Sequence, residues 1–94
     1  MKLILMAAIT SIALATAGAA GAQEALAKSS GCLNCHAVDG KKVGPGFKEV
    51  AAKYKGKADA EATLTAKLSA AKGHPAVKAG ADDLKSIVNW ILSL

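Results

Sequence analysis

Hydrophobic residues recur with helical spacing in three stretches of the chain, which predicts three amphipathic helices. The first helix covers residues 47–55 and ends at Gly56. The second begins near Ala60 and stops at Gly73, and the third starts at residues 82–83 and reaches the C-terminus. Acidic residues near the start of the second and third helices complement the helix dipole. The predicted apolar faces consist of Phe47, Val50, Ala51 and Tyr54, then Ala60, Leu64, Leu68 and Ala71, and finally Leu84, Ile87, Val88 and Ile91, with Trp90 beside them.

A fourth helical segment is predicted from Glu24 to about Leu33. Between it and the next helix, Gly40 and residues 43–46 predict irregular chain, because Pro45 has no amide donor and glycine adopts conformations that other residues avoid. No stretch alternates between apolar and polar residues as a half-buried strand does. The predicted fold class is therefore all-α, with three to four short helices joined by loops.

The N-terminal residues have the pattern of a secretory signal peptide. Lys2 precedes an apolar run over residues 3–15, and a stretch of small residues ends at Ala22. We expect cleavage after Ala22, with Ala19 as a nearby alternative, so that residues 1–22 are removed and residues 23–94 form one domain. The apolar run is shorter than the roughly 20 residues that span a membrane, so the mature chain is expected to have no permanent membrane span.

Both cysteines of the chain lie in the run Cys32-Leu33-Asn34-Cys35-His36, a C-x-x-C-H motif. This motif is typical of covalent haem attachment. Each thiol can form a thioether with a haem vinyl group, and the adjacent imidazole can bind the iron as proximal ligand. The sequence therefore predicts one haem c bound through the two cysteines and ligated by the histidine.

Three other sites use the same residue types. A thioredoxin-like dithiol needs a βαβ pattern, which the chain lacks. A zinc site formed by the two cysteines with His36 and His74 would need a second ligand pair a few residues apart, and these histidines are 38 positions apart. A plain disulfide is possible in a short secreted chain, although so small a loop constrains the unfolded state only weakly.

The size of the predicted domain also favours a large cofactor. A domain of residues 23–94 gains little stability from its own side chains. Its three aromatic residues, Phe47, Tyr54 and Trp90, are too few to fill a core. A covalently held porphyrin would supply the missing apolar surface.

Several motifs resemble class I (monohaem) cytochromes c of the small bacterial periplasmic type, over nearly all of residues 24–94. They are G-C-x-x-C-H at residues 31–36, V-G-P at 43–45, F-K-x-V-A-x-K-Y at 47–54 and W-I-L-S-L at 90–94. The resemblance implies a small cytochrome c fold wrapped around one covalent haem. It also implies that the carbonyl of Pro45 accepts a hydrogen bond from the proximal His36 imidazole, which would orient the ring and raise its basicity.

The chain departs from this family on the distal side of the haem. The family provides a Met-Pro pair in the loop before the terminal helix, whereas Met1 and Met6, the only methionines, lie in the predicted signal peptide. His74 is followed by Pro75 and precedes Trp90 by 16 residues, about the family's spacing for its methionine. We therefore expect His74 as the distal iron ligand. An unligated loop histidine and lysine ligation through Lys72 or Lys78 remain alternatives.

The predicted function is that of a periplasmic one-electron carrier with bis-histidine ligation, a protein of electron transport rather than an enzyme. Methionine ligation raises haem potentials, so its replacement by histidine predicts a lowered potential. One alternative is a haem protein with an open distal site that binds NO, O2 or peroxide. Another is the haem subunit of a periplasmic dehydrogenase.

The charge of the chain bears on its partners. It has 12 basic and 7 acidic residues, and loss of Lys2 with the signal leaves a net charge of +4. The cluster of lysines after the haem motif suits docking of an acidic redox-partner protein, or is only a solvated surface. Nucleic-acid binding is not expected, because there is no arginine and few aromatic residues. The clustered residues are Lys41, Lys42, Lys48, Lys53, Lys55 and Lys57.

Overall fold

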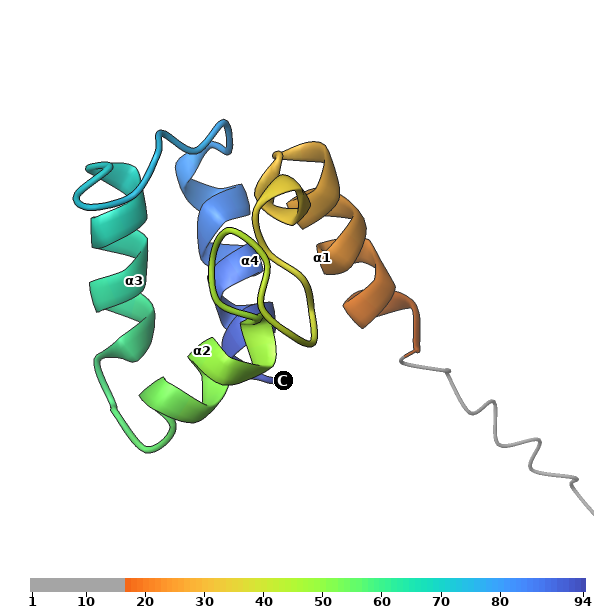
Figure 1. Cartoon of the computed structure of the whole chain (residues 1–94), viewed down its shortest axis with the longest axis horizontal. Coiled ribbons are helices and arrows are strands. Elements are labelled where there is room, and N and C mark those ends of the chain that lie inside the picture. Colours follow the sequence, from red (N-terminus) through yellow and green to blue (C-terminus); the bar gives the residue numbers. More distant parts are fainter. Residues whose placement is uncertain (1–16) are drawn as a thin grey trace, which may run out of the picture.

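The protein is a bundle of four α-helices and one short 3-10 helix, seen in a computed structural model that describes residues 17–94 (Figure 1). No strand occurs in this part of the chain, and the all-α prediction is confirmed. No helix within the same residues combines the length and apolar character needed to cross a membrane. The elements are α1 (Ala17–Ser29), η1 (Cys32–Asn34), α2 (Phe47–Tyr54), α3 (Ala60–Ser69) and α4 (Ala81–Leu92).

Helix α1 differs from the helix predicted over residues 24–33 at both ends. It begins at Ala17, and the predicted cleavage site after Ala22 falls within it. It ends at Ser29 because Gly31 adopts a left-handed conformation, with φ of 84°, and the chain then turns into η1. Residues 1–16 of the predicted signal peptide lie outside the described residues.

Helix α3 ends at Ser69, earlier than the predicted stop at Gly73. The left-handed residue that closes it is Ala71, with φ of 51°. The Ala71 amide donates to the Leu68 carbonyl at 3.3 Å, and the Lys72 amide donates to the Lys67 carbonyl at 3.1 Å, which is the Schellman pattern. Glycine usually occupies this position, so a search of the sequence for a glycine stop finds Gly73 instead.

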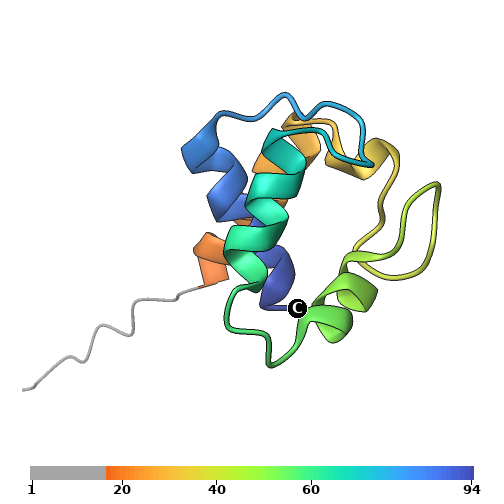
Figure 2. The same cartoon turned by 90° about the vertical axis from the view of Figure 1, so that its left-hand side faces the viewer.

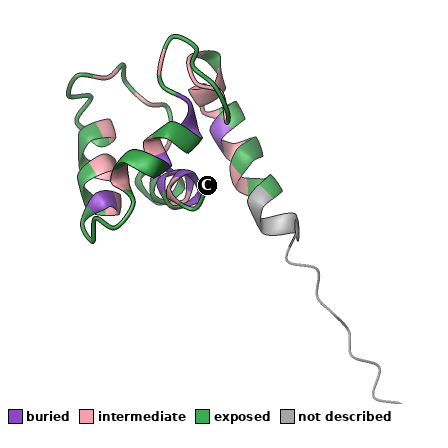
Figure 3. Cartoon of the chain, turned by 60° about the horizontal axis from the view of Figure 1, so that its bottom comes forward, coloured by how far each residue is buried: buried purple, intermediate pink, exposed green. Residues whose placement is uncertain are grey.

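Helix α4 is the centre of the bundle and packs against α1, α2 and α3. Its residues Leu84, Ile87, Val88 and Ile91 are all buried, as their helical spacing predicts. Trp90 is buried as well, and the Phe47 ring of α2 meets it edge to face with centroids 5.7 Å apart. Figure 3 shows the buried positions on α4 and on the turns of α1 and α2 beside it.

Helix α3 stands apart from the main core. It packs on α4, on the side away from α1, as the two views in Figures 1 and 2 show. Its apolar residues Leu64 and Leu68 are only half-buried and do not belong to the hydrophobic cluster formed by α1, α2 and α4. The apolar side of α3 is therefore left without a full set of protein partners in the described part of the chain.

We predict that Ile87→Ala in the haem-loaded protein lowers the free energy of unfolding by about 3 kcal/mol, because it removes a fully buried side chain at the centre of the bundle. Asn89→Ala on the exposed side of the same helix is the control and should change stability by less than about 0.5 kcal/mol. Guanidinium unfolding followed by circular dichroism measures both. Equal midpoints for the two variants would show that α4 does not organise the core.

Candidate functional site

The C-x-x-C-H motif forms the tight turn of η1. The amides of Cys35 and His36 both donate to the Cys32 carbonyl, at 3.3 and 3.0 Å, so two thiols and an imidazole leave the chain within about one turn. Both cysteines are free and half-buried. Burial raises the pKa of the Cys32 thiol. The thiols are thus not joined to each other and are available for thioether bonds.

The His36 imidazole is oriented by Pro45. Its Nδ1 lies 2.7 Å from the Pro45 carbonyl oxygen. A carbonyl oxygen only accepts hydrogen bonds, so Nδ1 carries the proton and donates it. The lone pair is then on Nε2, the nitrogen available to a metal. The structure brings together the two residues that the family resemblance paired.

Two further residues confine the His36 ring, and neither contact was predicted. A side-chain carbon at Gly44 would lie 2.8 Å from the ring Nδ1, so only glycine fits against the imidazole there. Phe47 stacks on the ring, with centroids 5.1 Å apart and planes 23° from parallel. Phe47 was expected only as a core residue. The glycine next to Pro45 was the one available sign of a close approach.

The loop that carries Gly44 and Pro45 is fastened back onto the haem motif. The Gly44 amide donates to the Cys35 carbonyl at 2.7 Å, and the Phe47 amide donates to the Ala37 carbonyl at 2.9 Å. The Lys42 ammonium donates to the Leu33 carbonyl at 3.2 Å, inside the motif. These bonds fix the loop from both ends, so that it holds the proximal imidazole in one orientation.

His74 lies opposite His36. The two rings are parallel within 4°, and their centroids are 6.0 Å apart. His74 Nδ1 lies 2.7 Å from the Pro75 carbonyl oxygen, so it also carries the proton and leaves Nε2 free. The alternative ligands Lys72 and Lys78 are both exposed.

The separation of the imidazoles suits a metal between them. A metal–imidazole bond is about 2 Å long and a ring nitrogen lies about 1 Å from its ring centre, so two imidazoles on opposite sides of one metal have centres about 6 Å apart. Two free thiols and an imidazole with a free Nε2 are the groups that haem c needs. The residues therefore fit a haem held by Cys32, Cys35 and His36. Within residues 17–94, no group of three or more His, Cys, Asp or Glu side chains is placed to hold a metal ion, as the zinc alternative would require.

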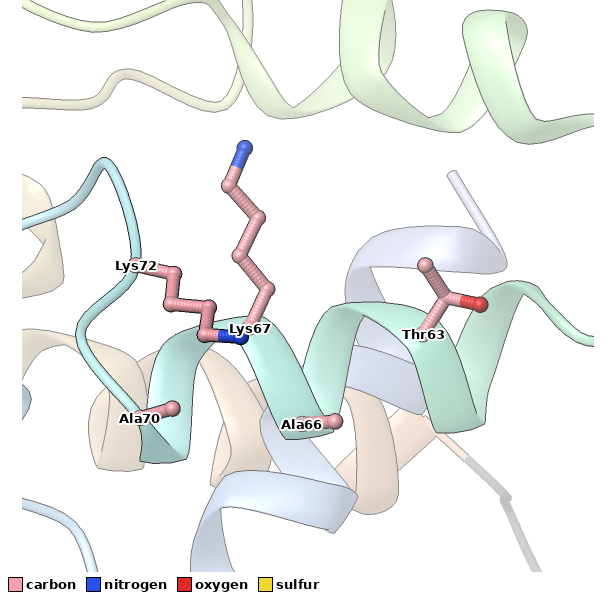
Figure 4. Close-up of a pocket in the computed structure, with 5 residues that line it drawn as sticks. All are labelled: Thr63, Ala66, Lys67, Ala70 and Lys72. Atoms are coloured by element: carbon pink, nitrogen blue, oxygen red, sulfur yellow. The ribbon is translucent and has the colours of Figure 1, made fainter.

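A separate hollow of about 510 Å³ lies over α3. Figure 4 shows its lining, which comes only from α3 and the turn after it and includes none of the motif residues. This hollow is a surface feature of one helix and not the haem site. Its lining residues are Thr63, Ala66, Lys67, Ala70 and Lys72.

We predict that Gly44→Ala disturbs the proximal imidazole, because the added methyl group overlaps the His36 ring. The expected result is a changed electron paramagnetic resonance spectrum of the oxidised holoprotein and a loss of about 1–3 kcal/mol of stability. Gly80→Ala is the control, since nothing lies within 4 Å of a side chain added there. An unchanged spectrum for Gly44→Ala would mean that the ring is not confined on this side.

Comparison with known proteins agrees with this site. The family profile described as "Cytochrome c" matches residues 18–94. Cytochrome c-551 of Allochromatium vinosum is 42% identical over 90 residues, which cover 87% of this chain and 96% of that protein. Cytochrome c-552 of Nitrosomonas europaea is 36% identical over 102 residues and covers 100% of this chain and 99% of its own length.

Solved structures show the same fold. The wild-type cytochrome c552 of Nitrosomonas europaea superposes with a TM-score of 0.67 at 38% identity and covers 76% of this chain and 98% of its own. The class 1 cytochrome MtoD of Sideroxydans lithotrophicus ES-1 has a TM-score of 0.65 at 37% identity, with 83% and 95% covered. The chain therefore belongs to the cytochrome c family and is a small c-type cytochrome of the class I type, an electron carrier with one covalently attached haem c.

Proposed function

We propose that this protein is an exported low-potential electron carrier in which His36 and His74 both ligate the haem iron. The observation that carries this proposal is the pair of parallel imidazoles, with centroids 6.0 Å apart and both Nδ1 protons donated to carbonyl oxygens. The absence of methionine after residue 6 supports it further, because the chain has no thioether sulfur to offer beyond the predicted signal peptide.

The chain's own residues account for the lowered potential. When bound, the haem supplies the Fe(III)/Fe(II) couple. Each imidazole donates its Nδ1 proton to a backbone carbonyl, of Pro45 or of Pro75, which raises the basicity of Nε2. A more basic ligand favours the more positive iron, and neither imidazole gives the increase in potential that a methionine sulfur would. With both axial positions filled by the protein, the function supported is electron transfer and not substrate chemistry.

We also propose that residues 1–22 are a cleaved signal peptide and that the mature chain, residues 23–94, works in the periplasm. The packing of α1 supports this division. Ala27 is fully buried and Leu26 packs against the core cluster, and both follow the predicted cleavage site. Removal of residues up to Ala22 would thus leave these contacts of α1 in place.

The proposed partner is an acidic redox protein that docks on the lysine-rich region formed by the loop after the motif and α2. All six of its lysines are exposed. Lys53 and Lys57 lie over the Tyr54 ring, at 5.8 and 5.3 Å from its centroid, which fixes two of the positive charges beside one flat aromatic surface. Such a surface steers an oppositely charged partner.

His74→Ala tests the ligation. We expect the oxidised parent protein to give a low-spin spectrum of two imidazoles and the variant to be high-spin, because the distal nitrogen is removed. His74→Met should raise the reduction potential by on the order of 0.1 V, a fraction of the ≈ 0.8 V range that axial ligands span. Lys78→Ala, four residues along the same loop, is the control and should leave both readings unchanged. A high-spin parent, or a low-spin His74→Ala variant, would contradict bis-histidine ligation.

Whole-protein mass spectrometry tests attachment and processing together. After expression with a periplasmic haem-attachment system, we expect the mass of residues 23–94 plus one haem. Cys32→Ala with Cys35→Ala should yield a chain from which acidified organic solvent extracts all haem, because no thioether can form. A parent that loses its haem in the same extraction would contradict covalent attachment, and retention of residues 1–22 would contradict cleavage.

A further inference from the structure

The two opposed imidazoles are held very unequally by the protein. His36 follows directly after Cys35 and is confined by Gly44, Pro45 and Phe47, which lie eight to eleven positions further along the chain. The ring of His74 makes its hydrogen bond to Pro75, the next residue. A bond to an adjacent residue orients the ring but does not tie it to another part of the fold.

The segment that carries His74, residues 71–80, is here named the distal strap. It runs as an open loop from the end of α3 to the start of α4 in Figures 1 and 2. The Lys72 amide still bonds back to α3, and the Gly80 carbonyl accepts the first bond of α4. Between them, residues 73–79 make no backbone-to-backbone hydrogen bond within the described part of the chain.

Few side chains anchor the distal strap. Ala79 packs against the hydrophobic cluster and Val77 is half-buried, whereas the other residues apart from His74 are exposed. The strap also begins with two left-handed residues close together, Ala71 with φ of 51° and Gly73 with φ of 65°. Segments with few buried contacts and few hydrogen bonds open at low free-energy cost. The strap is therefore the part of the haem surroundings that moves most easily.

We propose that His74 is an exchangeable ligand and that opening of the distal strap creates a binding site for a small uncharged diatomic molecule on the distal side. This inference rests on the bis-histidine ligation proposed above. In the exchange, the electron pair of Nε2 withdraws and the electron pair of the incoming molecule takes its place, so nothing is oxidised or reduced. No proton is needed, because Nδ1 keeps its proton on the Pro75 carbonyl.

The composition of the distal strap favours an uncharged ligand. Apart from His74, its residues nearest in sequence to the ring are small or apolar, namely Gly73, Pro75, Ala76 and Val77. The released imidazole stays tethered close to its former position and competes at a high effective concentration. Binding from solution is therefore limited by the rate at which His74 leaves.

The test is the reaction of the reduced holoprotein with carbon monoxide, followed by absorbance in a stopped-flow instrument. We expect an observed rate that levels off at high carbon monoxide, because release of His74 becomes limiting. Gly73→Ala should raise this plateau by roughly fivefold, since an alanine strained in the left-handed conformation weakens the closed strap.

Gly56→Ala is a matched control. Gly56 has φ of 79° and, like Gly73, nothing within 4 Å of an added side chain, but it lies between α2 and α3. It should lower stability to a similar degree and leave the plateau unchanged. No reaction with carbon monoxide within an hour, or equal acceleration in both variants, would overturn the inference. A high-spin parent that binds carbon monoxide without a plateau would instead show that His74 is not a ligand, which separates failure of the proposed function from failure of the strap.

Discussion

The hydrogen bond from His36 Nδ1 to the Pro45 carbonyl is the interaction on which the proximal half of the molecule depends. It fixes the tautomer that leaves Nε2 for the iron, and it ties the loop after the motif to the ring. The same loop delivers Gly44 to the ring edge and leads directly into Phe47, which reaches both the imidazole and Trp90. One bond thus links the metal ligand to the hydrophobic core, so disturbance of the loop is felt in both.

The helices that the sequence predicts well are those whose pattern of burial is local. Helix α2 was expected over residues 47–55 and is observed over Phe47–Tyr54, because its apolar spacing corresponds to a real buried face. The ends of α1 and α3 were missed for a different reason. Gly31 lies inside the stretch that was assigned to a helix, and Ala71 adopts a conformation in which glycine is usual. Both ends depend on one dihedral angle that spacing does not encode.

The site divides in the same way. Cys32, Cys35 and His36 follow from a motif whose spacing is itself the chemistry, whereas the place of His74 was inferred from a missing methionine and a neighbouring proline. The contact of Gly44 with the imidazole could not be predicted, because it depends on how a loop folds back over residues eight positions earlier. Contacts of that kind are set by the closed loop and not by the order of residues.

The packing of α1 against α4 brings the first described helix of the chain onto the last. The haem motif follows α1 directly, yet the helix that completes the core is the last part of the chain to be made and exported. Until it arrives, Cys32 and Cys35 stay accessible in an unfinished fold, and a contact across nearly the whole sequence also forms slowly. The order of residues thus builds in a delay during which the cofactor can be joined to the chain before the core closes around it.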